Sequence, residues 1–348
     1  MKKLIAALLL IALLLPAAAL ADGVVNVYNW FDYIDESVLE QFEEETGIHV
    51  NYMNFTTNED MLVMVEANPG AIDVVFPSEY CVQRLLNKGL LMELDFSRIP
   101  NFSQIAANLL DPSYDPGNAH SVPYMWGTLG ILYNKELVDE ADVSTWGVLW
   151  NEKYKGQVLM MDSIRDGMGL ALKYLGYSMN STDYTQLRAA TDLLIQQKTS
   201  GMVKSYGLDE FKDKMVAGEA ALAVVYSGDA QYAIDLDEEG RLAYAIPEEG
   251  SNIWVDCAVI PAAARNVDNA YAFIDFLCRP DVARKNVEEI WYCSVNTGAI
   301  ELLGEEYASL YVLNPSEDIR ARLEYYNDLD ATWLTVYNTL WQEVKQAN

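Results

Sequence analysis

The chain has 348 residues, of which 51% are hydrophobic and 22% are charged, enough for two lobes with cores of their own. Its formal net charge of −29 at pH 7 argues against nucleic acid or an anionic membrane surface as a partner and favours attraction of cations. Many exported proteins are acidic for solubility alone, so the charge excludes partners without identifying a ligand.

Residues 1–21 have the pattern of a secretory signal peptide. A basic start, Met1-Lys2-Lys3, is followed by the apolar run Leu4–Leu15 and by the small-x-small cleavage signal Ala19-Leu20-Ala21. The apolar run is shorter than the roughly 18 residues that a membrane-spanning helix needs. We therefore expect a mature chain that begins near Asp22 and is soluble in the periplasm.

The first part of the chain alternates strands and helices. Strands are expected over Val24–Trp30, Ile48–Met53 and Ile72–Phe76, and helices over Glu36–Glu45, Glu59–Glu66 and Val82–Lys88. This βαβαβ order predicts a parallel sheet with helices on both faces. Ligands of such sheets gather at the carboxyl ends of the strands.

A second alternating set follows the run Ile131–Asn134. Strands are expected over Val158–Met161, Ala220–Tyr226, Leu242–Ile246 and Asn252–Pro261, and helices over Ile164–Leu175, Thr185–Gln197, Asp209–Val216, Val267–Cys278, Val282–Ile290 and most of Ile319–Glu343. The sequence has no internal repeat and no flexible linker. Two lobes without a linker indicate that the chain crosses between them more than once, and we expect crossings near Ile131 and near Trp254.

Aromatic and acidic side chains recur together at predicted strand ends. Trp254 and Asp256 are two residues apart in a strand, so both point to the same side of the pleat. An aromatic face attracts an ammonium group by about 0.5 to 2 kcal/mol, and a carboxylate adds a charge-assisted hydrogen bond. Similar combinations stand at Trp30–Tyr33 and Tyr226–Asp229, and two acids stand at the strand end Asp162–Asp166. One such pair is more simply a core aromatic and a strand-end acid, but four strand ends with side chains of these kinds indicate a site for an organic cation.

Cysteine and histidine give little sign of other chemistry. Four cysteines in an oxidising compartment allow one or two disulfides, although their spacing names no framework and each lies in a context where a buried thiol is common: Cys81, Cys257, Cys278 and Cys293. His49 and His120 form no cluster for zinc and no evident pair with a nucleophile. We expect no metal, no cofactor and no catalytic residue.

Several short segments, taken in order, resemble the spermidine/putrescine-binding proteins of bacterial polyamine ABC importers. These segments are Tyr28-Asn29-Trp30, Pro77–Tyr80, Pro123–Gly127, Gly228-Asp229, Trp254-Val255-Asp256, Cys278–Ala283 and Trp291-Tyr292. The resemblance implies an α/β, two-lobed periplasmic binding protein fold of type II, each lobe a sheet flanked by helices, with the ligand cleft between the lobes. It implies boundaries at residues 22–130 plus 256–300 for lobe 1 and 131–255 plus 301–348 for lobe 2.

The resemblance also implies a set of ligand-binding residues. The aromatic walls correspond to Trp30, Tyr33, Tyr80, Trp254 and Tyr292, with Tyr226 where the family usually has Trp, and Ser78 corresponds to a polar contact. Asp256 matches the main ammonium-binding carboxylate, and Asp166 the acid of the second lobe. Ser163 stands where spermidine binders have an acid. Asp32 and Asp229 resemble acids of the putrescine-preferring branch, so the polyamine length stays open.

Each of these residues also has an ordinary structural interpretation. Asp162 is as well explained as the N-cap of the helix that follows, Asp32 as a turn residue and Asp229 as a helix-start acid. The tyrosines would serve equally as packing. Asp256 differs, because an acid inside an apolar run is costly to bury without a partner.

The function expected from the sequence is that of a monomeric binding protein. It would capture putrescine, spermidine or both in an acidic, aromatic-lined cleft and deliver the ligand to a membrane permease of an ABC importer. A binding protein for a sugar or a cationic amino acid is the alternative. A secreted glycoside hydrolase is weaker still, because no pair of acids stands out by its spacing.

Overall fold

The computed structural model describes residues 23–348, so the expected signal peptide lies outside the described residues. The chain opens with β1 (Gly23–Trp30), α1 (Glu36–Thr46), β2 (Ile48–Phe55), α2 (Asn58–Ala67), β3 (Val74–Val75) and α3 (Glu79–Asn87). β1 pairs in parallel with β2 on one side and with β3 on the other. The predicted βαβαβ unit is therefore confirmed, although β3 is shorter than expected.

The longest strand, β4 (Ser121–Asn134), joins the two halves of the molecule. Its first part pairs antiparallel with β9 (Ile253–Val259), and its second part pairs antiparallel with β7 (Leu222–Tyr226) and β8 (Leu242–Ala245). The strands follow the order β2-β1-β3-β9-β4-β7-β5-β6, in which β5 spans Val158–Met161 and β6 spans Val203–Gly207. The sheet is thus parallel over the predicted βαβαβ unit and mixed beyond it, because β9 runs antiparallel to β3 as well as to β4.

The second lobe carries its own parallel strands and helices. β5 (Val158–Met161) lies in parallel between β7 and β6 (Val203–Gly207). The helices here are α4 (Ile164–Tyr174), α5 (Tyr184–Thr199), α6 (Glu210–Val216) and α7 (Ser227–Leu236). β6 was not expected, because the segment contains Lys204, Ser205 and Gly207 and lacks a strong apolar pattern.

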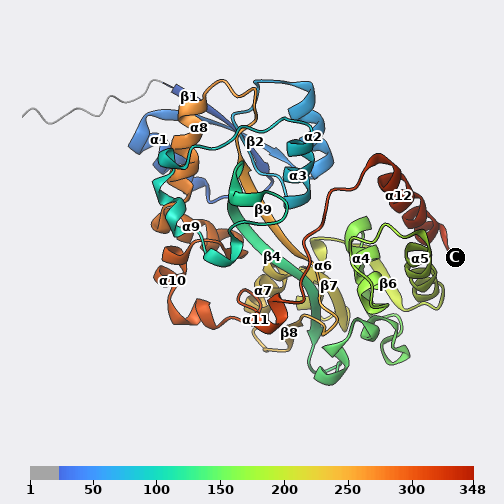
Figure 1. Ribbon diagram of the computed structural model, residues 1–348. Helices are drawn as coiled ribbons and strands as arrows, with labels where there is room; N and C mark the ends of the chain where they lie inside the picture. The colour runs from blue at the N-terminus through green and yellow to red at the C-terminus, as the bar shows by residue number, and fades with distance from the viewer. Residues whose placement is uncertain (1–22) are drawn as a thin grey trace, which may run out of the picture.

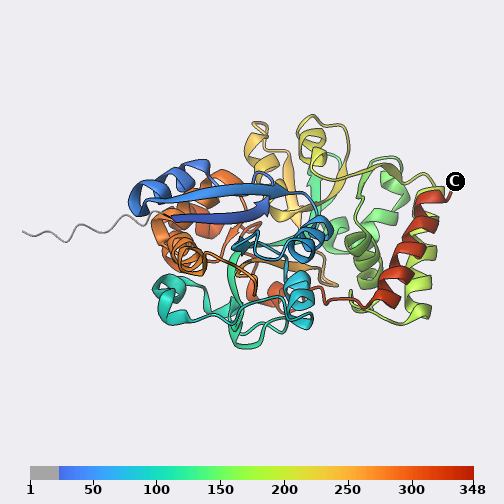
Figure 2. The same cartoon turned by 90° about the horizontal axis from the view of Figure 1, so that it is seen from above.

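The last part of the chain visits both lobes. It forms α8 (Val267–Leu277), α9 (Pro280–Ile290), β10 (Cys293–Ser294), α10 (Thr297–Ser309), α11 (Glu317–Arg320) and α12 (Ala331–Gln346). α10 packs against α9, whereas α12 packs against α4 and α5 (Figure 1). Figure 2 shows the same division from above, with α12 beside the helices of the second lobe. The lobe boundaries given above stay a prediction.

Residues 321–330 are not helical, so the helix expected over most of Ile319–Glu343 is wrong in this part. The backbone N–H groups here bond to other elements instead of to a helix. Glu324 N donates to Ser251 O at 2.9 Å, and Asp328 N donates to Gln83 Oε1 at 2.7 Å. Asp330 then caps α12 by accepting from Trp333 N.

Short 3-10 turns fill the loops before β4 and between β4 and β5. They span Phe96–Arg98, Pro100–Gln104, Ala107–Leu109, Pro116–Asn118, Glu140–Ser144, Trp146–Trp150 and Glu152–Tyr154. No helix within residues 23–348 has the length and apolarity to cross a membrane.

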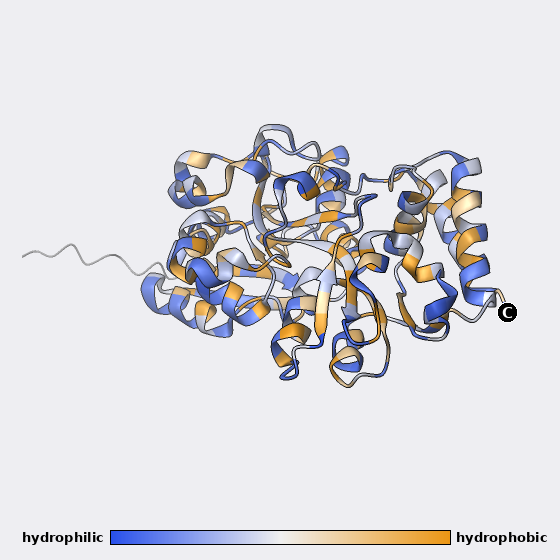
Figure 3. Ribbon diagram, turned by 90° about the horizontal axis from the view of Figure 1, so that it is seen from below, coloured by the Kyte–Doolittle hydropathy of each residue, from blue (hydrophilic) through white to orange (hydrophobic). Residues whose placement is uncertain are grey.

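Two clusters of buried side chains form the core. One contains Phe42 and Phe273, and the other contains Trp146 and Tyr337. Figure 3 shows hydrophobic and hydrophilic residues alternating around the outer helices, as expected for helices that bury one face. The four cysteines are free and buried, so the disulfides that their even number allowed do not form.

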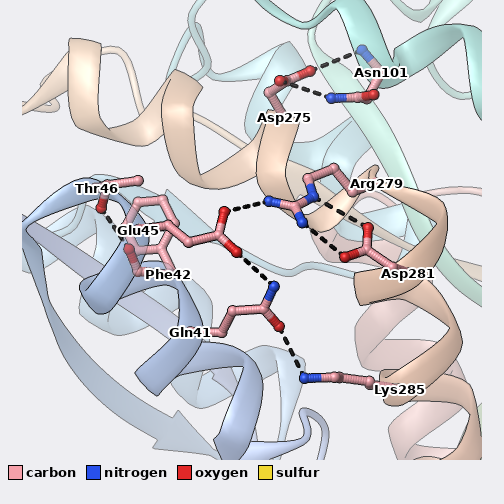
Figure 4. A network of polar contacts seen from close by, with 9 residues as sticks. All are labelled: Gln41, Phe42, Glu45, Thr46, Asn101, Asp275, Arg279, Asp281 and Lys285. Atoms are coloured by element: carbon pink, nitrogen blue, oxygen red, sulfur yellow. Dashed lines mark hydrogen bonds and ion pairs between the residues drawn. The ribbon is translucent and has the colours of Figure 1, made fainter. Parts of the chain in front are cut away.

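A polar network fixes α9 against α1 (Figure 4). Arg279, which precedes α9, donates to Glu45 Oε2 at 2.5 Å and to Asp281 Oδ2 at 2.7 Å, and Lys285 donates to Gln41 Oε1 at 2.9 Å. α9 ends at Trp291, whose φ of 59° is left-handed and turns the chain sharply. The polar network and the left-handed turn at Trp291 together set the direction of the next residue, Tyr292.

Glu79 connects α3 to two segments that lie between the lobes. Its side chain is fully buried at the first turn of α3. Oε2 accepts a hydrogen bond from Val255 N at 3.2 Å, and Oε1 accepts one from Tyr326 N at 3.2 Å. Burial raises the pKa of Glu79 to about 8, helped by the charge of Asp256 and opposed by these hydrogen bonds.

The raised pKa of Glu79 makes stability depend on pH. The folded protein keeps the proton up to about pH 8, whereas the unfolded chain loses it near its ordinary pKa of 4.5, so stability falls as pH rises between these values. We expect Glu79 to lower the free energy of unfolding by about 2 to 3 kcal/mol between pH 6 and pH 8.

Urea unfolding at several pH values checks this prediction. Glu79→Gln, which does not titrate, should show a flatter pH dependence than the parent protein and lower stability at pH 6, because its NH₂ group faces a backbone N–H. Glu93→Gln, at an exposed position, serves as the control. Equal slopes for the parent and Glu79→Gln would contradict the assignment.

Candidate ligand-binding site

Four aromatic rings form a row from one lobe to the other. Tyr33 and Tyr292 have ring centroids 5.8 Å apart, Tyr292 and Trp254 5.0 Å, and Trp254 and Tyr226 6.1 Å, and each pair meets edge to face. These residues come from the loop after β1, the start of β9, the turn after α9 and the end of β7. The structure therefore brings together four of the predicted aromatic residues from distant parts of the chain.

Two glycines make room for this row. A Cβ atom on Gly127 would lie 2.4 Å from the Trp254 ring, and one on Gly228 would lie 2.3 Å from the Tyr292 ring. Real side chains essentially never approach so closely, so each ring needs a glycine beneath it. Both glycines stand in the segments that carry the resemblance, but their packing role was not foreseen.

Asp256 faces this row from β9 and is almost completely buried, with 6% of its surface exposed. Tyr33 OH donates to Oδ2 at 2.8 Å, and Ser78 Oγ donates to Oδ1 at 2.7 Å. Burial raises the pKa of Asp256 to about 6, and the two hydroxyl donors oppose that rise. The acid in the apolar run thus has partners, and both are neutral.

Asp166, in the first turn of α4, is a second buried acid of the candidate site. Its Oδ2 accepts from Tyr226 OH at 2.9 Å and from Ser163 Oγ at 2.5 Å, and its Oδ1 accepts from Tyr326 OH at 3.1 Å. Like Asp256, it is bound by hydroxyl groups. Ser163 and Tyr226 were among the predicted residues, and Tyr326 was not.

The N-cap of α4 is Ser163 and not Asp162. Ser163 has extended backbone angles, and its Oγ accepts from Asp166 N. The carboxylate of Asp162 instead pairs with Lys345 Nζ at 2.6 Å and is 41% exposed. The suggested cap role for Asp162 is therefore wrong by one residue, and its side chain belongs to a surface ion pair.

Asp229 lies in the first turn of α7, with 13% of its side chain exposed. Lys212 Nζ, from α6, is 3.2 Å from Asp229 Oδ1. Burial raises the pKa of Asp229, and the positive charge of Lys212 acts in the opposite direction. This predicted acid has a cation as its partner.

The remaining predicted residues have other neighbours. The Trp30 ring contacts Phe55, with centroids 4.5 Å apart. Asn58 Nδ2 donates to Tyr80 OH and to Ser78 Oγ, both at 3.0 Å, and so ties these two residues together. Asp32 is exposed with a φ of 50°, as a turn residue would be, and no ion pair or hydrogen bond between described side chains joins its carboxylate to the other candidates.

Two residues that contribute hydrogen bonds around the site had no clear signal in the sequence. Tyr326 falls in a segment for which a helix was expected, and Glu79 is one of many acids of the chain. Within residues 23–348, no group of three or more His, Cys, Asp or Glu side chains is arranged to hold a metal ion. The arrangement can instead surround an elongated cation with aromatic rings and place a buried carboxylate in each lobe.

Comparison with known proteins gives the family. The profile of the bacterial extracellular solute-binding proteins matches residues 37–310. The chain is 35% identical to the spermidine/putrescine-binding periplasmic protein of Escherichia coli strain K12 over 95% of this chain and 97% of that one. It is 34% identical to a putrescine/cadaverine-binding protein of Pseudomonas aeruginosa over 97% and 98% of the two chains.

Solved structures agree with this result. The structure described as a putative spermidine/putrescine ABC transporter from Listeria monocytogenes superposes with a TM-score of 0.85 at 40% identity, covering 93% of this chain and 99% of that one. The predicted α/β, two-lobed fold is confirmed. This chain belongs to the bacterial extracellular solute-binding proteins, and within them to the family of the spermidine/putrescine-binding proteins.

Proposed function

We propose that this protein is a periplasmic binding protein that captures a polyamine, putrescine or spermidine or both, and delivers it to an ABC importer. The observation that carries this proposal is the buried carboxylate of Asp256, held by two hydroxyl groups beside a row of aromatic rings. The names of the relatives supply the ligand class.

The chemistry of a polyamine matches such a site. Its ammonium groups, separated by methylenes, need carboxylates at a distance from one another and apolar walls between them. Asp256 and Asp166 supply a carboxylate in each lobe, and the rings supply a surface for methylenes and for cation–π contacts. A micromolar Kd corresponds to about 8 kcal/mol, which two charge-assisted contacts and several stacked rings provide after the costs of ordering.

The residues proposed to line the cleft are those expected from the sequence. Trp30, Tyr33, Tyr80, Tyr226, Trp254 and Tyr292 form the walls, and Ser78 and Ser163 orient the acids. Asp166 and Asp256 receive ammonium groups, Asp229 stands next to Gly228 beneath the Tyr292 wall, and Asp32 lies at the rim.

The working cycle follows from the two-lobed architecture. The monomer closes its lobes on the ligand, which removes water from the ammonium groups, and the closed form docks on the permease. The protein has no enzymatic role in this cycle. Both curated relatives described above are named as binding proteins, which supports that assignment.

Replacement of Asp256 tests the proposal. Asp256→Asn keeps the shape and removes the charge that faces the ammonium group, so polyamine affinity should fall by about 3 kcal/mol, or roughly 100-fold. Titration calorimetry on the mature protein, stripped of ligand by unfolding and refolding, gives this difference for putrescine and spermidine, with lysine as a comparison ligand.

Asp162→Asn is the matched control, because it removes the same charge at a surface ion pair and should change affinity only slightly. A folded parent protein that binds neither polyamine would refute the proposed function. Equal affinities of Asp256→Asn and the parent would refute the role of Asp256.

Binding should also weaken in acid. A carboxylate receives an ammonium group only when ionised, and the pKa of Asp256 in the protein without ligand is about 6. Below that pH, a proton must leave before the ligand binds, so Kd should rise about tenfold for each further pH unit. Titrations from pH 5 to pH 8 check this, and a Kd that stays constant down to pH 5 would contradict it.

A further inference from the structure

Three acids of the candidate site, Asp256, Asp166 and Asp229, differ in the charge of their partners. Asp256 is bound by Tyr33 and Ser78, and Asp166 by hydroxyl groups alone. No ion pair among residues 23–348 involves either of these two carboxylates, whereas Asp229 pairs with Lys212 at 3.2 Å. Asp229 is thus the acid whose charge the protein itself neutralises.

Arg165 does not provide the same neutralisation for its neighbour Asp166. Its guanidinium stacks on the Tyr326 ring, 4.4 Å from the centroid. It donates to Asn327 O and to Asn180 Oδ1, both at 3.0 Å. The guanidinium is therefore engaged with the segment before α12 and forms no ion pair with Asp166.

The charge of Asp229 influences the ring of Tyr292, which is one of the four rings in the row. It follows Gly228, the residue beneath the Tyr292 ring. Burial raises the pKa of Tyr292, and the negative charges of Asp229, Asp209 and Asp256 raise it further. Asp229 and Asp256 therefore both lie within electrostatic reach of Tyr292, and the net charge around Asp229 affects a ligand held against that ring.

The surroundings of Lys212 favour its charged form and hold its side chain in place. It lies on α6, which packs against α7, and its Nζ is 5.3 Å from the centroid of Tyr232 on α7. Burial alone would lower the pKa of Lys212, but Asp229, Asp209 and Asp213 together raise it. The ammonium group of Lys212 is thus a fixed positive charge beside the third acid.

We propose that Lys212 sets the number of ammonium groups that the site accepts. By pairing with Asp229, it leaves Asp256 and Asp166 as the two of these three site acids that have no cationic partner, so the site favours a diamine such as putrescine over a triamine such as spermidine. This inference rests on the proposed function and concerns only which polyamine is preferred.

The physical reason is the cost of an unpaired ammonium group. A third ammonium that enters the closed cleft must give up water and then either lack a carboxylate or compete with Lys212 for Asp229. The lysine would also repel it, because two like charges would share one acid. Discrimination of this kind depends on a repulsive element as much as on attractive contacts.

The test compares Kd for putrescine and spermidine in four proteins by titration calorimetry. The parent should bind putrescine at least about tenfold more tightly than spermidine. In Lys212→Gln, which frees Asp229, spermidine affinity should rise by about tenfold or more, while putrescine affinity changes by less than about threefold.

Lys214→Gln is the matched control. Lys214 lies on the same helix with the same 30% exposure of its side chain, but it pairs with Glu210 instead of Asp229. This variant removes the same charge and should leave the ratio of the two affinities unchanged. The double variant Lys212→Gln, Asp229→Asn avoids a buried unpaired carboxylate and should lack the gain for spermidine.

Several results would overturn the inference. They are a parent protein that prefers spermidine, an unchanged ratio in Lys212→Gln, an equal gain for both ligands, or a gain that persists in the double variant. Any of these leaves polyamine binding itself intact. If the folded parent binds neither polyamine, the proposed function fails and this inference fails with it.

Discussion

The burial of one carboxylate, Asp256, in an apolar strand is the constraint on which the site depends. Removing such a group from water costs free energy unless hydrogen bonds compensate, and here Tyr33 and Ser78 provide them from two other segments. Both donors are neutral, so the negative charge stays available to a cation. The rings beside it exclude water and strengthen any electrostatic contact that a ligand makes.

Asp256 lies on β9, which pairs with the first part of the long strand β4. β4 pairs with β9 over one half of its length and with β7 and β8 over the other, and the segment before α12 connects to both sides. Tyr326 illustrates the arrangement, since its backbone N–H bonds to Glu79 and its hydroxyl bonds to Asp166. One residue thus contacts the acid of the second lobe and the helix that starts beside Ser78.

The sequence predicted most regular elements because their local signals are strong. α1 ends at Gly47, whose φ of 72° requires the freedom of glycine, and β5 and β7 are short apolar runs. The length of β4 was underestimated because Pro123, Gly127 and Gly130 interrupt its apolar pattern. Pro123 also coincides with a shift in the register between β4 and β9. Trp254 and Asp256 were predicted from their spacing in a strand, whereas Tyr292 followed from the family resemblance. Lys212 and Tyr326 did not, because their contacts arise only from tertiary packing.

The four buried thiols have a consequence for how the protein reaches its native state. Cys81, Cys257, Cys278 and Cys293 are all free, so no covalent cross-link has to form before the cores close. Folding does not wait for an oxidase or an isomerase, and cysteine pairing adds no slow phase. The unfolded chain, in contrast, exposes four sulfurs to any oxidant that is present. Fast burial of these residues is then what protects the chain from wrong cross-links.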